Sequence, residues 1–418
     1  MNVTVIGAGY VGMVQAVGLA SLGHRVRLGE ANPDRVAMIQ SGESPIFEKG
    51  LRSLLRLVLD DGTLSVHSNN LDALSEADVI FVALPTPSAP DGSADLSAIA
   101  GLLDEISPHL PDGAVLVFKS TVPVGTTADI QRKLGDRIHV ASNPEFLREG
   151  SAVSDFLEPD RIVIGVTDSD AGEKLRKLYD AIDAPLVMTD PASAELAKYA
   201  ANAYLATRVT FGNAIANLCE AVGADVKDVL DGIGHDHRIG RHFMRPGPGF
   251  GGSCFPKDTQ ALVNAAEQSG YDFTLLKSVI AENVAQRSRV LDKVRSAAGG
   301  ELAGVQVAVW GAAYKGGTDD LRSSPALWLI QRMHAEGAEV TVFDPAATVD
   351  GITMASSPLE AAAGAVVLLV ATEWDIFSTV DMTAVAEAMA GEWIIDARNM
   401  LNPADVRGAG LHYRGIGR

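Results

Sequence analysis

The sequence predicts an α/β protein with two doubly wound, parallel-sheet domains joined by a long central helix and a helical middle region. Three observations lead to this prediction. A strand, a glycine turn, a helix and a strand open the chain; a helical pattern without proline runs from residue 192 to Gly223; and the opening order recurs after residue 304. We expect domains at residues 1–190, 191–298 and 299–418, because 418 residues exceed what one core usually organises.

Composition and charge limit the partners of the chain. With 47% hydrophobic and 21% charged residues, the protein is expected to fold throughout. A formal net charge of −19 repels phosphate backbones and anionic lipids, so neither nucleic acid nor a membrane is an expected partner. The apolar run AVVLLVA is far shorter than the roughly 20 residues of a membrane span. The opening MNVTVIG lacks signal-peptide features, so we expect a cytoplasmic protein.

The first domain is expected to alternate strands with helices. β-Branched residues 3–6 predict the first strand, helical spacing follows, and residues 26–28 predict the next strand. Further apolar strands are expected in ADVIFVALPTP, AVLVFKSTVPVG, RIHVASNPEF and RIVIGV, which helix-length segments separate. This alternation is typical of a parallel sheet with helices on both faces.

The opening turn carries the pattern GxGxxG at Gly7, Gly9 and Gly12, and Glu30 ends the next strand. Such glycines allow a tight turn and let a pyrophosphate approach the helix N-terminus, while the acid accepts hydrogen bonds from a ribose diol. The domain is therefore expected to be Rossmann-like. A carboxylate would repel a 2′-phosphate, which favours NAD over NADP. The alternative is a glycine turn that only packs the helix on the strand.

Polar residues follow the apolar strands of this domain. Thr86 and Pro87, Thr121, and Glu145 with Glu149 each come just after a strand. Strand ends in a doubly wound sheet face the ligand crevice, so we expect these residues to line it. Each of them alone is equally well explained as a turn or cap residue.

The central helix carries Lys198 and Asn202 at i and i+4, hence on one face. A lone helix lysine more often belongs to a solvated face. Further helices are expected in PKDTQALVNAAEQSG and TLLKSVIAENVAQRSRVLDKVRSAA. The central helix and these two segments together predict a helical middle region.

The chain has two cysteines, which fit neither a disulfide framework nor a metal-binding spacing, so no metal is expected. Cys219 lies in an apolar helical segment and is expected to be a small buried thiol. Cys254 lies in GFGGSCFPKD, beside Lys257 and Asp258. Glycines let a ligand approach and a nearby lysine favours the thiolate, so Cys254 is a candidate nucleophile.

An NAD site and a nucleophilic thiol together predict a four-electron oxidation. Hydride transfer from a primary alcohol gives an aldehyde, and a thiolate adds to it to form a thiohemiacetal. Loss of a second hydride gives a thioester, which a base-activated water hydrolyses to a carboxylic acid.

The segment after residue 304 repeats the opening order, and Asp344 stands where the first half has Glu30. This second half is also expected to be Rossmann-like, with later strands in AGAVVLLVAT and WIIDARN. It lacks the three-glycine pattern, so we expect only the first half to bind a dinucleotide.

The motifs also carry a resemblance over nearly the whole chain. In this order, GAGYVG, STVPVG, NPEFLREG, ELAKYAANAYLA, RIG, GFGGSCFPKD, AYKGGTDDLRSSPAL and IIDARN resemble the UDP-glucose/GDP-mannose dehydrogenase family. The ordered set is far more specific than any one motif. Gly316, Gly317 and Ser323 depart from residues common in the family, which bears on the substrate pocket more than on the chemistry.

The resemblance implies roles for individual residues. Cys254 matches the nucleophile, Glu145 the base for thioester hydrolysis, and Thr121 a hydroxyl that holds the same water. Lys198, Asn202 and Asp258 match residues that stabilise the oxyanion and position water. The implied cofactor-binding residues are Gly7, Gly9, Tyr10, Val11, Gly12, Glu30, Arg35, Thr86, Pro87, Thr121, Glu149 and Arg322.

The resemblance also implies a nucleotide-sugar site. Its residues are Glu145, Phe146, Leu147, Lys198, Asn202, Arg238, Phe243, Arg245, Phe250, Gly251, Lys315 and Arg398. Arg and Lys pair with a pyrophosphate even in an acidic protein. Arg238 matches an arginine that reaches the substrate of the partner subunit, which implies a homodimer built on the central helix.

The expected activity is NAD-dependent oxidation of C6 of UDP-glucose to UDP-glucuronate, with release of two NADH. The alternative within this chemistry is dTDP-glucose or GDP-mannose as substrate. A remote alternative is an NAD-responsive regulator in which Cys254 is a redox sensor; that reading requires a resolving thiol nearby.

Overall fold

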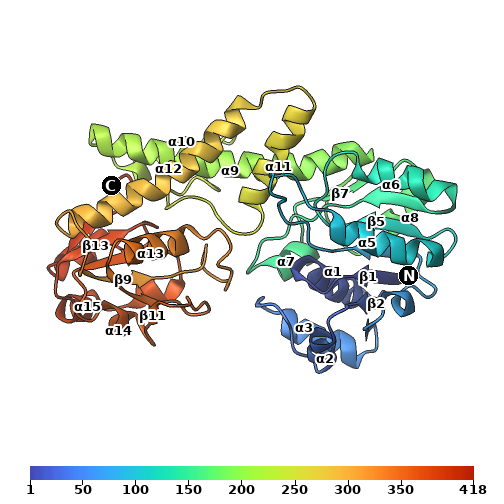
Figure 1. The fold of residues 1–418 in the computed structure, drawn as a ribbon, viewed down its shortest axis with the longest axis horizontal. Coiled ribbons are helices and arrows are strands. Elements are labelled where there is room, and N and C mark those ends of the chain that lie inside the picture. The colour runs from blue at the N-terminus through green and yellow to red at the C-terminus, as the bar shows by residue number, and fades with distance from the viewer. The chain divides into compact units, whose positions relative to one another are not determined.

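A computed structural model describes residues 1–418, and the chain divides into two compact units, Met1–Ala201 and Asn202–Arg418. Figure 1 shows that each unit has its own sheet with helices packed against it. None of the helices combines the length and the apolar character that crossing a membrane requires. The division predicted at residues 190/191 and 298/299 stays a prediction.

The first unit contains an eight-stranded sheet in the order β3-β2-β1-β4-β5-β6-β7-β8. Its strands are β1 (Asn2–Ile6), β2 (Arg25–Gly29), β3 (Leu64–His67), β4 (Val79–Val82), β5 (Val115–Phe118), β6 (His139–Ser142), β7 (Ile162–Gly165) and β8 (Leu186–Thr189). All pairs are parallel except β6 and β7, which meet antiparallel at Ser142 and Gly165. The two edge strands β3 and β8 were not predicted, because they are partly exposed and lack the continuous burial of the inner strands.

Helices cover both faces of this sheet, which confirms the doubly wound prediction. They are α1 (Tyr10–Ser21), α2 (Pro33–Gln40), α3 (Leu51–Asp60), α4 (Asn70–Ala73), α5 (Ser97–Ile106), α6 (Thr126–Leu134), α7 (Ala152–Leu157) and α8 (Ser169–Leu178). Successive strand residues alternate between two cores: Val79 and Phe81 pack with α1, α3, α7 and α8, whereas Ile80 and Val82 pack with α5 and α6.

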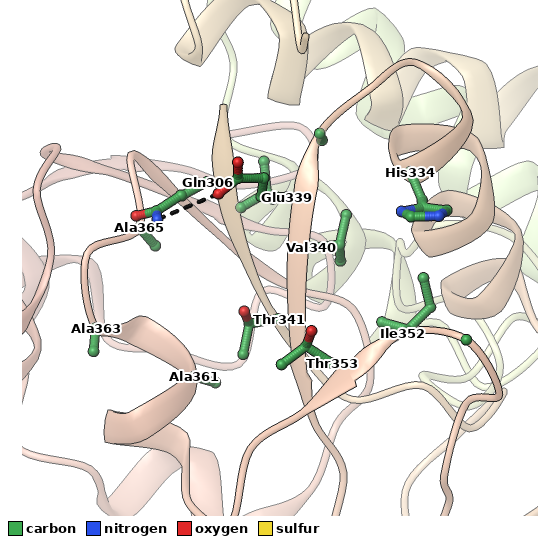
Figure 2. Close-up of a pocket in the computed structure, with 13 residues that line it drawn as sticks. Gln306, His334, Glu339, Val340, Thr341, Ile352, Thr353, Ala361, Ala363 and Ala365 are labelled. Carbon is green, nitrogen blue, oxygen red and sulfur yellow. Dashed lines mark hydrogen bonds between the residues drawn. The ribbon is translucent and has the colours of Figure 1, made fainter. Parts of the chain in front are cut away.

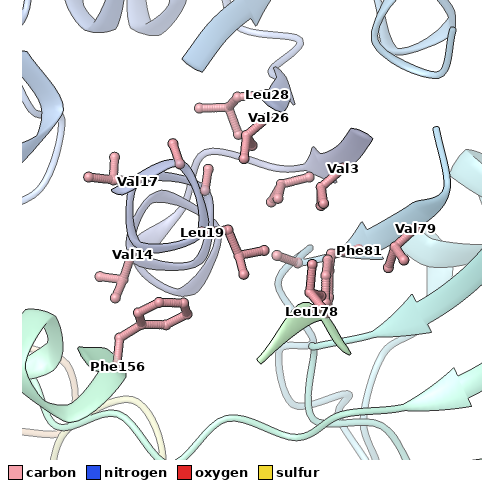
Figure 3. Close-up of a cluster of buried hydrophobic side chains, with 14 of the residues drawn as sticks. Val3, Val14, Val17, Leu19, Val26, Leu28, Val79, Phe81, Phe156 and Leu178 are labelled. Atoms are coloured by element: carbon pink, nitrogen blue, oxygen red, sulfur yellow. The ribbon is translucent and has the colours of Figure 1, made fainter. Parts of the chain in front are cut away.

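The core around α1 is tightly closed (Figure 3). Gly18 of α1 lies against the ring of Phe156 from α7, and a Cβ added at Gly18 would come within 2.3 Å of that ring. Leu19 and Phe81 are fully buried in the same core. Each such side chain contributes about 1.5–3 kcal/mol of burial free energy, so this core holds the first helix rigidly over the sheet.

The second unit contains a six-stranded, wholly parallel sheet in the order β11-β10-β9-β12-β13-β14. Its strands are β9 (Gln306–Trp310), β10 (Glu339–Phe343), β11 (Thr353–Met354), β12 (Val367–Val370), β13 (Trp393–Asp396) and β14 (His412–Arg414). The edge strands β11 and β14 have two and three residues and were not predicted. The four inner strands lie where the sequence predicts them.

The helices of the second unit are α10 (Val226–Gly234), α11 (Phe255–Gln268), α12 (Thr274–Ala297), α13 (Pro325–Ala335), α14 (Pro358–Ala362), α15 (Met382–Ala388) and α16 (Pro403–Gly408). Helix α9 (Pro191–Val222) is the predicted long central helix; it has 32 residues and contributes to both units. It starts at a proline and ends before Gly223, whose φ of +77° is the left-handed conformation that stops helices.

Candidate active site

The turn between β1 and α1 requires glycine at two of its three glycine positions and has free space beside the third. Gly7 has φ of +101°, and a Cβ on Gly12 would lie 1.8 Å from the carbonyl oxygen of Gly7. Nothing lies within 4 Å of a Cβ on Gly9. The middle glycine therefore leaves space at the N-terminus of α1, where a pyrophosphate needs a close approach of the backbone.

Glu30 ends β2 beside this turn. Its Oε2 accepts the N–H of Ala8 at 3.0 Å and its Oε1 accepts the N–H of Asn32 at 2.8 Å. Arg35 Nη1 lies 4.0 Å from the carboxylate, which is mostly buried. An ionised carboxylate offers about four acceptor positions, so lone pairs remain for a ribose diol. Together with the open space at Gly9, this turn fits a dinucleotide.

The corresponding turn of the second unit is closed. Residues 311–316 read GAAYKG, so Ala313 stands where the first turn has Gly9. Ala313 is fully buried, and Thr372 Oγ1 donates to its carbonyl oxygen at 2.6 Å. The carboxylate of Asp344 accepts from the N–H groups of Ala312, Ala313, Ala346 and Ala347 and from the indole of Trp374. This geometry agrees with the prediction that only the first half holds a dinucleotide.

Strand ends in the first unit carry the predicted polar residues. Thr86 is buried after β4 and its hydroxyl donates to the carbonyl oxygen of Thr121, after β5, at 2.9 Å. Pro87 is exposed and Thr121 is half-buried. The structure thus joins the two loops at the carboxyl edge of the sheet.

Glu145 and Lys198 form a buried ion pair. Lys198 Nζ of α9 lies 2.9 Å from Glu145 Oε1, and both side chains are less than 8% exposed. Glu145 Oε2 also accepts the N–H of Leu147 at 2.6 Å. Burial raises the pKa of Glu145, but the charge of Lys198 and these hydrogen bonds outweigh it and hold the pKa below its ordinary value. The carboxylate is therefore ionised at neutral pH and able to act as a base.

Phe146 lies next to this pair and between two cations. The guanidinium carbon of Arg161 lies 3.6 Å from the ring centroid, and Lys198 Nζ lies 5.5 Å from it. Cations over a ring face are attracted to it, so Phe146 helps to place both. Arg161 was not predicted. The only indication of it in the sequence is its position directly before the apolar run of β7.

Glu149 belongs to a loop that is tied to the dinucleotide turn. The carboxylate of Glu48 accepts from the Tyr10 hydroxyl, from the N–H of Gly150 at 2.7 Å and from the N–H of Ala152 at 3.1 Å. Burial, then Glu48 and Glu149, raise the pKa of Tyr10, so its hydroxyl stays protonated and donates. Glu48 was not predicted, and Val11 beside Tyr10 is half-buried.

In the second unit, Cys254 caps the N-terminus of the 14-residue helix α11. The thiol is partly exposed, and Ser253 Oγ lies 3.5 Å from its Sγ. A helix N-terminus favours a negative charge, which suits a thiolate. Cys219 is buried in the core of the same unit, as predicted.

One turn along α11 from Cys254 lies a buried carboxylate. Asp258 is 1% exposed; its Oδ2 accepts from Asn202 Nδ2 and its Oδ1 from Lys257 Nζ, both at 2.6 Å. The pair with Asn202 joins α11 to α9, and Lys198 lies one turn earlier on the same face of α9. Two separate buried pairs, Glu145–Lys198 and Asn202–Asp258, thus hold polar side chains of α9.

The cysteine loop is held by residues that were not predicted. Asn283 of α12 accepts the N–H of Phe250 at 2.7 Å and donates to its carbonyl oxygen at 3.1 Å. Gln286 donates to the carbonyl of Gly247, whose N–H is bound by Asn213 of α9. Asn283 and Gln286 lie in the buried stripe of α12, and polar residues at core-facing helical positions were the available signal.

The glycines of this loop permit close contacts with the segment between β9 and α13. A Cβ on Gly251 would lie 2.3 Å from the carbonyl oxygen of Ser323, and one on Gly252 would meet the ring of Tyr314. The N–H of Gly252 bonds to the carbonyl oxygen of Arg322 at 3.0 Å. Phe250 and Phe243 both pack near Phe255, with centroids 6.1 and 6.4 Å apart.

The predicted cations of the second unit differ in surroundings. Arg398, two residues after β13, is mostly buried, donates to the carbonyl oxygens of Ala371 and Tyr314, and pairs with Glu373 at 2.9 Å. Lys315 Nζ lies 5.6 Å from the Tyr314 ring centroid. The other three predicted cations are exposed: Arg238, which pairs with Asp236, Arg245, and Arg322, which pairs with Asp320.

A cavity of about 400 Å³ also lies in the second unit (Figure 2). Gln306 and Glu339, joined at 3.4 Å, start β9 and β10 and line it together with His334 of α13. It therefore opens at the amino ends of the strands. The glycine turn and Arg398 lie at the carboxyl ends, so this cavity does not belong to the candidate site.

Three segments of the chain match the domains of one family. Residues 1–183 match the NAD-binding domain of the UDP-glucose/GDP-mannose dehydrogenase family, residues 192–285 its central domain, and residues 308–403 its UDP-binding domain. The chain belongs to this family.

Curated relatives and a solved structure match this chain over its full length. The chain is 41% identical to UDP-glucose 6-dehydrogenase of Pseudomonas aeruginosa, over 100% of this chain and 98% of the relative. It is 42% identical to UDP-glucose 6-dehydrogenase of Rhizobium meliloti, over 100% of both. A UDP-glucose dehydrogenase structure from Pyrobaculum islandicum matches with a TM-score of 0.92 at 36% identity, over 100% of this chain and 97% of that chain.

Family membership confirms three expectations. This dehydrogenase is an oxidoreductase, its cofactor is NAD, and residues 308–403 form a UDP-binding domain, which supports a nucleotide-sugar substrate. NAD fits the turn at Gly9 and Glu30 described above. The roles of individual residues stay predictions. The structure contains no group of three or more His, Cys, Asp or Glu placed to hold a metal ion.

Proposed function

We propose that this dehydrogenase oxidises C6 of UDP-glucose to the carboxylate of UDP-glucuronate, with consumption of two NAD and one water. The observation that supports the proposal is a set of groups held in the two units: the buried pair Glu145–Lys198 in the first, and the buried pair Asn202–Asp258 with the partly exposed Cys254 one helical turn away in the second. It combines a nucleophile, oxyanion donors and a base, which an alcohol-to-acid oxidation requires.

In the proposed mechanism, each group of this set has one task. The Cys254 thiolate adds to the aldehyde carbon, and the resulting oxyanion is stabilised by the ammonium of Lys198 and the amide of Asn202. Asp258 orients that amide by accepting its N–H. Glu145 takes a proton from the water that attacks the thioester, the C–S bond breaks, and the thiolate is restored. NAD, when bound at Gly9 and Glu30, supplies the acceptor for both hydrides.

The nucleotide end of the substrate is assigned to the second sheet. Arg398 and Lys315 lie at the carboxyl ends of its strands, where doubly wound sheets bind ligands, and their charges suit a pyrophosphate. Because the turn at Ala313 is closed, the second unit does not bind a dinucleotide there. We assign the UDP group of the substrate to this unit instead. dTDP-glucose and GDP-mannose are the competing substrates, and rates measured with all three sugar nucleotides decide among them.

We also propose a homodimer built on α9. Tyr204, Phe211 and Leu218 are spaced seven residues apart on one face of this helix and are 59%, 50% and 56% exposed. An apolar stripe at heptad spacing on a long helix is suited to a matching helix of a second copy. In such a dimer Arg238 is the residue proposed to reach the partner's substrate. Light scattering should report a dimer, and Phe211→Glu should shift it toward monomer.

Two measurements test the proposed function. NADH formed per UDP-glucose consumed should be two, and a value of one would rule out the thioester route. Cys254→Ser should stop acid release, with a loss of about a thousandfold or more, because a hydroxyl is a far weaker nucleophile than a thiolate. Cys219→Ser is the matched control and should keep turnover. A redox regulator would show no turnover in the wild type; it also needs a second thiol, and Cys219 is buried in a helical core.

A further inference from the structure

A buried amine bonds to Asn143, two residues before the proposed base Glu145, and the mechanism above leaves this amine without a task. Lys119 directly follows β5 and is 7% exposed. Its Nζ donates to Asn143 Oδ1 at 3.0 Å. Burying a lysine is costly, and here its only described side-chain bond is to a neutral amide, so a structural role alone does not account for it.

The amide of Asn143 does not depend on Lys119 for its orientation. Asn143 Oδ1 also accepts from the Tyr179 hydroxyl at 2.6 Å, and Asn143 Nδ2 donates to the carbonyl oxygen of Val163 at 2.7 Å. Gln15 of α1 in turn donates to the Tyr179 hydroxyl at 3.0 Å. Removing the amine would leave Asn143 with a donor and an acceptor in place.

The charge of Lys119 acts on Glu145, which lies two residues after Asn143. The Lys119 charge lowers the pKa of Glu145, in addition to the effects of Lys198. Conversely, burial lowers the pKa of Lys119 to about 7; the negative charge of Glu145 opposes this shift and the charge of Lys198 adds to it. Arg161, the other cation coupled to Glu145, lies over Phe146 on the strand-β7 side.

We propose that Lys119 is a positioning residue whose positive charge, rather than its hydrogen bond, sets how readily Glu145 takes up a proton during thioester hydrolysis. The inference rests on the proposed role of Glu145 as the base. It predicts that hydrolysis, and not the hydride steps, responds to loss of the charge.

The sign of the effect follows from the charges. Removing a positive charge beside a carboxylate disfavours its ionised form, so Lys119→Met should raise the pKa of Glu145. The acid limb of the hydrolysis rate should therefore move to higher pH. The wild-type profile should also change slope near pH 7, where Lys119 loses its proton, and Lys119→Met should lack that change.

The experiment has two readouts. Infrared or ¹³C NMR titration of the glutamate carboxylates, with the Glu145 signal assigned through Glu145→Gln, measures its pKa without substrate. Quench-flow from about pH 3.5 to 9 separates NADH formation from release of the acid, and only the second should move in Lys119→Met.

Three controls separate charge from structure. Tyr179→Phe removes the other hydrogen bond to the same Asn143 oxygen but keeps the charge, and should leave both readouts unchanged. Lys119→Gln, which keeps a donor without the charge, should reproduce Lys119→Met and serves if that variant folds poorly. Lys119→Arg should restore the wild-type limb.

Two outcomes would overturn the proposal: an unmoved Glu145 titration in the neutral variants, or an equal shift in Tyr179→Phe. Failure of the proposed function is a different result, since it appears in the wild type as an NADH stoichiometry other than two. The titration reports on the charge coupling in either case.

Discussion

The two halves of this dehydrogenase build the same strand–turn–helix–strand unit, and they differ at its centre. The first turn has Gly9, open on the side where a Cβ would point, and Glu30, whose carboxylate accepts two backbone N–H groups. The second has Ala313, fully buried, and Asp344, whose carboxylate accepts five donors. One methyl group and the use of one carboxylate thus separate a ligand cradle from a closed structural turn.

The largest loss of stability is expected at the last glycine of each turn, Gly12 and Gly316, where a Cβ would clash with a carbonyl oxygen. In Gly12→Ala the new methyl would lie 1.8 Å from the carbonyl oxygen of Gly7, so the turn must open. We expect the free energy of unfolding to fall by about 3 kcal/mol, and NAD binding to be lost. Gly316→Ala, which meets the carbonyl oxygen of Glu373 at 2.1 Å, should be as costly to stability yet spare NAD binding. Chemical denaturation and NAD titration measure both; retained NAD affinity in Gly12→Ala would contradict the comparison.

The second effect concerns the two acids. Asp344→Asn replaces the acceptor of five donors with a group that itself donates, so the free energy of unfolding should fall by about 2–3 kcal/mol. Glu30→Gln loses fewer bonds and should cost less stability but more NAD affinity. Thermal unfolding, with and without NAD, separates the two. Equal losses of stability would show that Asp344 is not the structural member of the pair.

A smaller change should separate binding from folding. Gly9→Ala adds a methyl with nothing within 4 Å, and the backbone there has φ of −72°, which any residue adopts. Stability should therefore stay within about 0.5 kcal/mol, while the Kd for NAD rises about tenfold or more because the methyl occupies the pyrophosphate side. Calorimetry against denaturation midpoints tests this. An unchanged Kd would place the dinucleotide elsewhere.

The smallest effect is expected from the reverse change in the second turn. Ala313→Gly removes one buried methyl and loosens the unfolded chain, at a cost of about 1 kcal/mol. It should not create a second NAD site, because the carboxylate of Asp344 still accepts from its own five donors. A binding stoichiometry of one NAD per chain in this variant supports the comparison, and a value of two would break it.

Much of the fold could be predicted because strong local patterns carry it. The inner strands are continuous apolar runs buried on both faces, and α9 is a proline-free helix bounded by Pro191 and Gly223. The edge strands β3, β8, β11 and β14 could not be predicted. They are two to four residues long and owe their conformation to pairing with a neighbour rather than to their own sequence.

The sequence predicted site residues that belong to a local motif, and it missed residues that contact the site from distant parts of the chain. Glu145, Lys198, Asn202 and Asp258 were identified, and the structure pairs them as Glu145–Lys198 and Asn202–Asp258. Asn283 binds the cysteine loop from a helix 33 residues away in sequence. No local pattern marks such a contact.

By itself the sequence determined the glycine turn, the acid at the end of β2, the long helix and the cysteine loop, because each depends on neighbouring residues and their backbone preferences. Only the tertiary structure decided which carboxylates are saturated, which glycine is open, and that Lys119 lies buried against Asn143. Those properties depend on burial and on partners distant along the chain, and the strength of a charge or a hydrogen bond is set by that environment rather than by residue type.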